Sequence, residues 1–296
     1  MEGDQASQFF ITYRLSPTSA FEGFKGIPIK YGDDYELQFQ GDLVWISFQG
    51  NSENWEKRRN EGLSFLKTFL SAVALLKEYP FGVEPVQWIE KRRECTEDKY
   101  ILGRLASTEL AVQAKPPKVT EEDIGKARLY LILAEINPLF KRAMIDYSVA
   151  LSFPGEAVVF APRALEAVET HFKSNSPVKV SANMRKRKTR DVMKQALSLP
   201  EKALKDFHKI ANDTTVARHV KELSQLRSPT LEEIRFCIVF CRIVLDKFAL
   251  YLWGENSDLL KHLMPLLEDV DVVQKIEESS IGLQDRLTKI LSGEIG

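Results

Sequence analysis

The sequence predicts an α+β protein in which a β-rich region with one packed helix is followed by an all-α helical bundle. Apolar and polar residues alternate in short runs between residues 8 and 48, which is the period of half-buried strands. Residues 54–77, and most of the chain after residue 120, instead repeat their apolar residues every three or four positions, as helices do. Between these regions the run AKPPK at 114–118 places two prolines together, which predicts a domain boundary.

The N-terminal region, residues 1–114, is predicted to be a meander of strands with one packed helix. Glycine and aspartate residues at 32–34 and 41–42 predict turns between strands. The region has no glycine-rich phosphate loop and no nucleophile elbow, so we expect a folding or docking unit without chemistry. The predicted strands cover residues 8–15, 27–31, 35–40, 43–48, 86–89, 100–105 and 110–112, and the helix covers 54–77.

The C-terminal region, residues 115–296, is predicted to be a helical bundle. Its most apolar helix is expected at 231–252, and a helix this apolar must be surrounded by others at the centre of a bundle. Thr230 and Glu233 precede that stripe with the spacing of a capping box. The other helices are predicted from Thr120, with a restart or kink at Pro138, and at 156–173, 189–198, 200–211, 259–267 and 270–291.

Composition excludes several classes of protein. The net charge of the 296 residues is −1, so a nucleic acid or an anionic membrane would need a local basic patch. The three cysteines and four histidines show no zinc spacing, and no metal or cofactor is expected. The N-terminus lacks the features of a signal peptide, and no run is long and apolar enough to span a membrane. We therefore expect a cytoplasmic protein without a membrane partner.

The most uneven charge of the sequence is a basic cluster ahead of residue 191. Its five residues are Arg185, Lys186, Arg187, Lys188 and Arg190. Such a cluster can follow a nucleic-acid backbone, because each basic side chain replaces a counterion of a phosphate. No aromatic residue lies between residues 172 and 207 to stack on a base. A solvated loop, or an N-terminal extension of the next helix, is the alternative that stays open.

The densest run of hydrogen-bonding and titratable groups is residues 212–219. Asn212, Arg218 and His219 are its candidate site residues, since an arginine beside a histidine can bind a phosphate and supply an acid or base near neutral pH. The alternative is a helix start with Asp213 as the N-cap. The two interpretations are compatible, because helix N-termini are themselves anion sites.

Two phrases, RALEAVETHF at 163–172 and NDTTVARHV at 212–220, resemble bacterial HEPN-type helical domains, with the similarity covering roughly 120–254. The resemblance implies a bundle of four or five helices that is often a homodimer. In active members it also implies metal-independent RNA cleavage by an Arg-x(4–6)-His motif. Here the nearest such pair, Arg163 and His171, has seven residues between its members, so Arg218 and His219 are the candidate catalytic residues.

Two hypotheses of function follow from these observations. The first is an RNA- or nucleotide-binding HEPN-like protein of bacterial defence or stress type. As an enzyme it would be a metal-independent endoribonuclease, with His219 as the base and Arg218 holding the transition-state phosphate. The second is a non-catalytic protein-interaction module whose β-rich region docks a partner protein.

Overall fold

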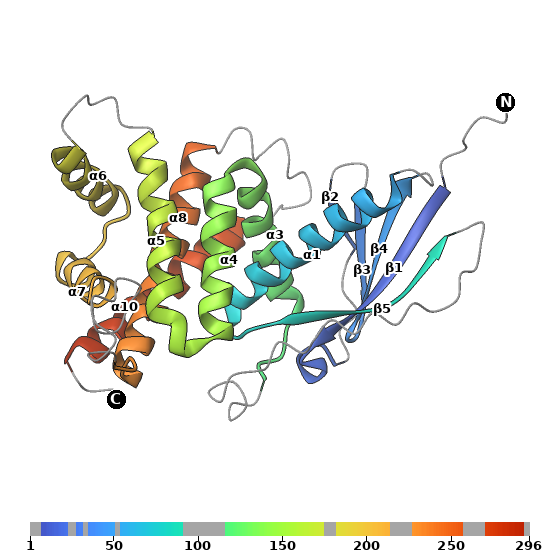
Figure 1. Cartoon of the computed structure of the whole chain (residues 1–296), viewed down its shortest axis with the longest axis horizontal. Helices are drawn as coiled ribbons and strands as arrows, with labels where there is room; N and C mark the ends of the chain where they lie inside the picture. Colours follow the sequence, from blue (N-terminus) through green and yellow to red (C-terminus); the bar gives the residue numbers. More distant parts are fainter. Residues whose placement is uncertain are drawn as a thin grey trace. The chain divides into compact units, whose positions relative to one another are not determined.

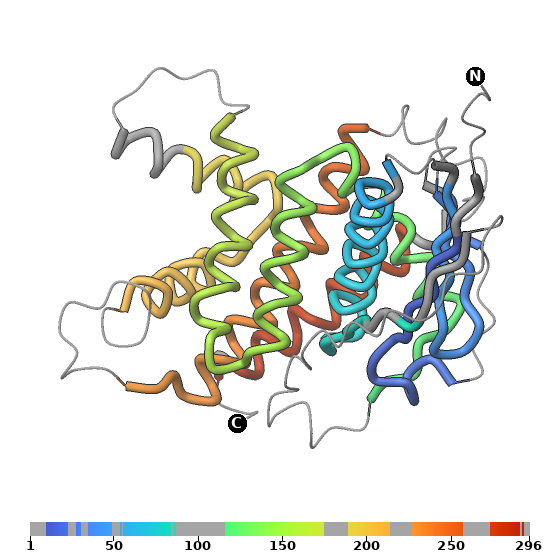
Figure 2. The backbone as a smooth tube through the Cα atoms, turned by 45° about the vertical axis from the view of Figure 1, so that its right-hand side comes forward, coloured from blue at the N-terminus to red at the C-terminus, as the bar shows by residue number. Residues whose placement is uncertain are grey.

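The chain divides into two compact units, Met1–Arg128 and Leu129–Gly296 (Figures 1 and 2). A computed structural model describes residues 7–22, 28–31, 35–50, 54–90, 116–174, 182–213, 227–256 and 270–292. The predicted fold class, a β-rich region with one helix followed by a helical bundle, is confirmed. The boundary predicted after residue 114 lies outside the described residues and stays a prediction, whereas the division into units falls inside helix α3 (Glu121–Ile136).

The first unit is built on a five-stranded antiparallel sheet with the order β2-β3-β4-β1-β5. Its strands are β1 (Ser7–Ser16), β2 (Ile29–Tyr31), β3 (Tyr35–Gln40), β4 (Leu43–Gly50) and β5 (Gly82–Glu90). Strands β2 to β4 follow one another as in the predicted meander, whereas β1 lies between β4 and β5. The strands predicted at 100–105 and 110–112 fall outside the described residues.

Strand β5 is longer than the sequence predicted because a proline is tolerated within it. Tyr13 pairs with Pro85 while Thr12 pairs with Gln87, so Val86 is the extra residue of a bulge. β5 lies at the edge of the described sheet, and edges and bulges are the places where a proline does not interrupt a ladder.

Helix α1 (Trp55–Lys77) packs on one face of this sheet. The rings of Phe39 and Phe69 lie 5.3 Å apart between strand and helix. A Cβ atom at Gly62 would lie 3.0 Å from the side chain of Ile46, so the close approach of helix and sheet favours a residue without a side chain there. The helix ends at Glu78, which has a left-handed φ of 49°.

The start of α3 is tied to the first unit. Thr120 and Asp123 cap it reciprocally: the Asp123 amide donates to Thr120 Oγ1 at 3.2 Å, and the Thr120 amide donates to Asp123 Oδ2 at 2.8 Å. Asp123 also pairs with Lys77 of α1 at 2.7 Å. The helix start predicted at Thr120 is therefore confirmed.

The second unit is a helical bundle centred on α8, which packs against α4, α5, α7 and α10. Its helices are α4 (Pro138–Ser152), α5 (Ala157–Ser174), α6 (Ala182–Ala196), α7 (Glu201–Ala211), α8 (Leu231–Glu255) and α10 (Val270–Ser292). The predicted central position of this apolar helix is confirmed. In both views α6 and α7 lie on the side of α5 that faces away from α4 (Figures 1 and 2).

Contacts between side chains give the directions of the three central helices. Asn137 at the start of α4 lies beside His171 near the end of α5, so these helices are antiparallel. Cys241 Sγ lies 3.7 Å from the carbonyl oxygen of Ala161, and the His171 ring lies 5.0 Å from that of Phe248, so α5 and α8 are parallel. The restart predicted at Pro138 is confirmed, with Asn137 as the N-cap.

A polar network is enclosed in the core of this bundle. Asp246 is fully buried and accepts hydrogen bonds from Tyr130 Oη at 2.7 Å and from Arg242 Nε at 2.8 Å. These contacts join α3 to α8 and satisfy both carboxylate oxygens, as a buried charge requires. None of the helices in the described ranges is both long and apolar enough to cross a membrane.

Candidate functional site

The predicted site region lies between the end of α7 and the start of α8. Arg218 and His219 belong to residues 214–226, which lie outside the described residues, so their proposed roles stay predictions. The same holds for a helix start after Asp213. The structure does describe both ends of this segment and the helices that carry them.

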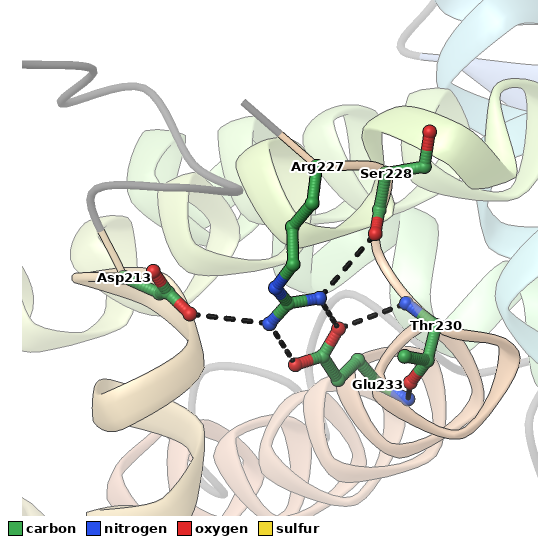
Figure 3. Close-up of polar contacts among 5 residues, drawn as sticks. All are labelled: Asp213, Arg227, Ser228, Thr230 and Glu233. Carbon is green, nitrogen blue, oxygen red and sulfur yellow. Dashed lines mark hydrogen bonds and ion pairs between the residues drawn. The ribbon is translucent and has the colours of Figure 1, made fainter. Parts of the chain in front are cut away.

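Arg227 joins the two ends of the segment. Its Nη1 and Nη2 atoms donate to the two carboxylate oxygens of Glu233 at 2.8 and 2.7 Å, in the bidentate geometry that makes the strongest arginine pairs. Nη2 also donates to Asp213 Oδ2 at 3.1 Å (Figure 3). Asp213 directly precedes residues 214–226 and Arg227 directly follows them, so one guanidinium holds the two ends together.

The same glutamate caps α8. The Glu233 amide donates to Thr230 Oγ1 at 3.2 Å, and the Thr230 amide donates to Glu233 Oε2 at 2.8 Å (Figure 3). The predicted capping box is therefore confirmed. The hydrogen bond from Arg227 lowers the pKa of Glu233, so its carboxylate is charged over the whole neutral range.

A second group of charges joins α5, α6 and α7. Oε1 of Glu169 accepts from Arg190 Nε at 2.9 Å and lies 3.3 Å from His208 Nε2. Burial alone would raise the pKa of Glu169, but the nearby His208 ring and the charge of Arg190 lower it. Arg190, a predicted nucleic-acid contact, is thus held by a carboxylate between three helices.

Asn212 ends α7 one turn after His208. Its side-chain amide donates to the carbonyl oxygen of His208 at 2.6 Å, and its backbone amide donates to the same oxygen at 3.1 Å. Both bonds satisfy a carbonyl that the end of the helix leaves free. Arg190 and Asn212, far apart in the sequence, are therefore linked to the last turn of α7 through Glu169 and His208.

The other predicted nucleic-acid contacts lie in the first turns of α6: Arg185, Lys186, Arg187 and Lys188. Their side chains lie outside the described residues. The helix was predicted to begin at residue 189, but it begins at Ala182. Lysine and arginine are strong helix formers, so the basic cluster extends the helix. Of the two alternatives to a nucleic-acid contact, the backbone supports the N-terminal extension.

Sequence reasoning missed three side chains of this region as site residues: Glu169, His208 and Arg227. Glu169 of α5 forms an interhelical ion pair with Arg190 of α6. The helical spacing of α5 predicts that Val168, the residue before Glu169, faces the core. The spacing does not predict that Arg190 of α6 and His208 of α7 lie beside Glu169, because these residues are distant from it in the sequence.

The described residues offer little for metal or nucleophilic chemistry. Among them, no group of three or more histidine, cysteine or acidic side chains is placed to hold a metal ion. Burial raises the pKa of the Cys237 thiol to about 12, and burial also raises the pKa of Cys241. Both thiols are protonated at neutral pH and lie inside the bundle, so they act as core residues and not as nucleophiles.

Comparison with known protein families, curated proteins and solved structures finds no match for this chain. The resemblance to HEPN-type domains therefore stays a prediction.

Proposed function

We propose that the helical unit binds the phosphate backbone of RNA along α6 and α7. The supporting observation is the segregation of charge. Residues 182–213 contain nine lysines and arginines but four acidic residues, a net charge of +5 in a chain whose total is −1. The rest of the chain therefore carries −6, and the excess of positive charge is concentrated on two consecutive helices. Local patches of this kind attract a polyanion even when the whole protein is nearly neutral.

The arrangement of α7 supports the proposal. Its apolar side chains Ala203, Leu204 and Phe207 are buried. Three lysines spaced three and four positions apart occupy exposed positions of the same helix: Lys202, Lys205 and Lys209. A helix with one buried face and a row of lysines on another can present several positive charges to successive phosphates.

The site at the end of α7 would extend this surface. Arg190 is held by Glu169, Asn212 ends α7, and Arg227 holds the ends of the segment that contains Arg218 and His219. The proposal is one of binding. Cleavage with His219 as the base is a separate outcome of the experiment, and it would add an activity without changing the binding surface.

A salt series with a fluorescently labelled single-stranded RNA tests the proposal by anisotropy. Reversing the charges of Lys202, Lys205 and Lys209 should weaken binding at least about tenfold at low salt and reduce the slope of log K against log salt by about 2, since each lost phosphate contact removes about 0.7. Reversing Arg185 to Lys188 should have a similar effect.

The matched control reverses three lysines that are equally exposed but lie in the first unit, Lys30, Lys57 and Lys67. This variant should bind RNA like the wild type. Equal weakening in the control would show a nonspecific charge effect. A folded wild-type protein that does not bind RNA at low salt would contradict the proposal and favour the protein-interaction hypothesis.

A further inference from the structure

A pair of arginines on α4 and α5 shares a buried carboxylate. Arg142 Nε donates to Asp146 Oδ2 at 2.8 Å, and Arg163 Nη2 lies 3.3 Å from Asp146 Oδ1. The Asp146 side chain is only 6% exposed, whereas those of Arg142 and Arg163 are 55% and 34% exposed. A buried acid therefore holds two surface arginines from different helices in fixed positions.

We infer that Arg142 and Arg163 form a binding site for a phosphate group, with Asp146 as their positioning residue. The site is independent of the RNA surface proposed on α6 and α7. It carries two positive charges against one negative charge, and both oxygens of that carboxylate already have partners. An incoming anion would therefore meet unused donors and a net positive charge.

The nitrogen atoms that do not contact Asp146 support this inference. Arg142 uses Nε for Asp146 and keeps Nη1 and Nη2, while Arg163 uses Nη2 and keeps Nε and Nη1. Within the described residues, neither arginine pairs with another acidic side chain. The Arg163 guanidinium also lies over the ring of Phe160, 5.0 Å from its centroid, which restricts the orientation of its plane.

Stability alone gives a weak reason for this arrangement. Burying a carboxylate costs free energy, and an ion pair with a half-exposed arginine returns little because water screens it. Arginines whose planes are fixed by a buried acid are instead well suited to a ligand, because less side-chain freedom is lost on binding.

The number of unused donors favours a phosphate over a carboxylate ligand. Arg142 and Arg163 keep two nitrogen atoms each, which suits the several oxygens of a phosphate group better than the two oxygens of a carboxylate. The spare nitrogens of both arginines can each donate to a different phosphate oxygen. The ligand class is therefore a phosphate group, either free or part of a nucleoside monophosphate.

Thermal unfolding of the full chain tests the site with two probes, inorganic phosphate and adenosine monophosphate, against sodium chloride at equal ionic strength. With a dissociation constant on the order of 1 mM, phosphate at about 20 mM should raise Tm by about 5 °C. Adenosine monophosphate giving the larger shift would assign the site to a nucleotide, and an equal shift would assign it to phosphate itself.

Replacing both arginines by glutamine should abolish the phosphate-specific shift. Because that change leaves Asp146 unpaired, a triple variant that also carries Asp146→Asn keeps the test valid if the double variant does not fold. Lysine at both positions keeps the charge but loses the planar fork, and it should weaken binding about tenfold. Arg235→Gln, which changes an arginine of the same unit, should keep the full shift.

Two results would overturn the inference. One is a wild-type Tm that rises no more in phosphate than in chloride. The other is a phosphate-specific shift that persists in a folded glutamine variant. Charge reversal of Lys202, Lys205 and Lys209 should leave the phosphate shift unchanged, so a failure of the RNA proposal and a failure of this one can be told apart.

Discussion

Helix α8 is associated with two arginine–carboxylate pairs whose charges lie almost equally close together in opposite environments. Near its middle, Arg242 and Asp246 lie 2.8 Å apart with side chains 3% and 0% exposed. At its first turn, Arg227 and Glu233 lie 2.7 Å apart with side chains 41% and 20% exposed. The distance between the charges does not distinguish these pairs, but the access of water does.

Burial changes what each pair does for the protein. Burial alone would lower the pKa of Arg242, but the carboxylate of Asp246 raises it above the ordinary value, so the guanidinium stays charged inside the bundle. Loss of one partner would leave the other charge without water or a counterion. At the first turn, water can replace a lost partner of Arg227, so this exposed pair adds little to the stability of the fold. Its main effect is to hold the ends of residues 214–226 beside the start of α8.

The largest expected effect is at the buried pair. Asp246→Asn leaves the Arg242 charge unpaired in the core and should lower the free energy of unfolding by about 3–5 kcal/mol, as measured by urea denaturation. Replacing Arg242 by Met and Asp246 by Leu together should recover most of this loss, because no buried charge remains.

The control is Glu232→Gln, which removes an exposed acid of the same helix and should change stability by less than about 0.5 kcal/mol. A cost for Asp246→Asn as small as that of the control would contradict the distinction between the two pairs.

An intermediate effect is expected at His171, a buried histidine beside the exposed Glu255. The side-chain oxygen of Asn137 accepts from the amides of Leu139 and Phe140, so its amide nitrogen faces His171 Nδ1 at 3.1 Å. This network assigns Nδ1 as an acceptor and the histidine as neutral. Protonation would place two donors against each other at this contact.

This arrangement makes stability depend on pH. Burial lowers the pKa of His171, and the Glu255 carboxylate, 3.8 Å away, only partly opposes that shift. Below about pH 6.5 the unfolded chain therefore binds the extra proton more readily than the folded one, and stability falls as the pH drops. His171→Gln keeps an acceptor for Asn137 and should reduce the loss of stability between about pH 7.5 and 5.5. Equal losses in the wild type and the variant would show that His171 has no part in this pH dependence.

The smallest effect is expected at the exposed pair. Arg227→Gln should lower the urea midpoint slightly at low salt, and the difference from the wild type should disappear at about 0.5 M sodium chloride, because exposed charges are screened. Arg235→Gln on the same helix is the control and should show no such salt dependence. A salt-independent loss as large as that of Asp246→Asn would mean that exposure does not separate the two pairs.

Local patterns predicted most of the described secondary structure. The capping box at Thr230, the restart at Pro138 and the apolar stripe of α8 depend on residues within a few positions of one another, and each was confirmed. The position of β1 between β4 and β5 was not predicted, because strand order depends on pairing between distant segments.

The candidate site was predicted less completely for the same reason. The sequence indicated the basic cluster at 185–190 and the polar run that begins at Asn212, because each of them is a continuous stretch of the chain. It did not indicate Glu169 between Arg190 and His208, nor Arg227 across the ends of residues 214–226. The contacts of Glu169 join three helices, and the contacts of Arg227 join the two ends of a connecting segment. Both sets link residues that are distant in the sequence.

The amino-acid sequence by itself determined which segments are helices and strands, where the positive charge is concentrated and which helix is buried, because spacing and composition are local properties. Only the tertiary structure decided which charges meet. Asp246 has Tyr130 as a partner, and Asp146 holds Arg163 of the neighbouring helix, because packing of the apolar faces brings these distant residues together. Whether a charge stabilises the fold or remains available to a ligand depends on that packing, since packing controls the access of water.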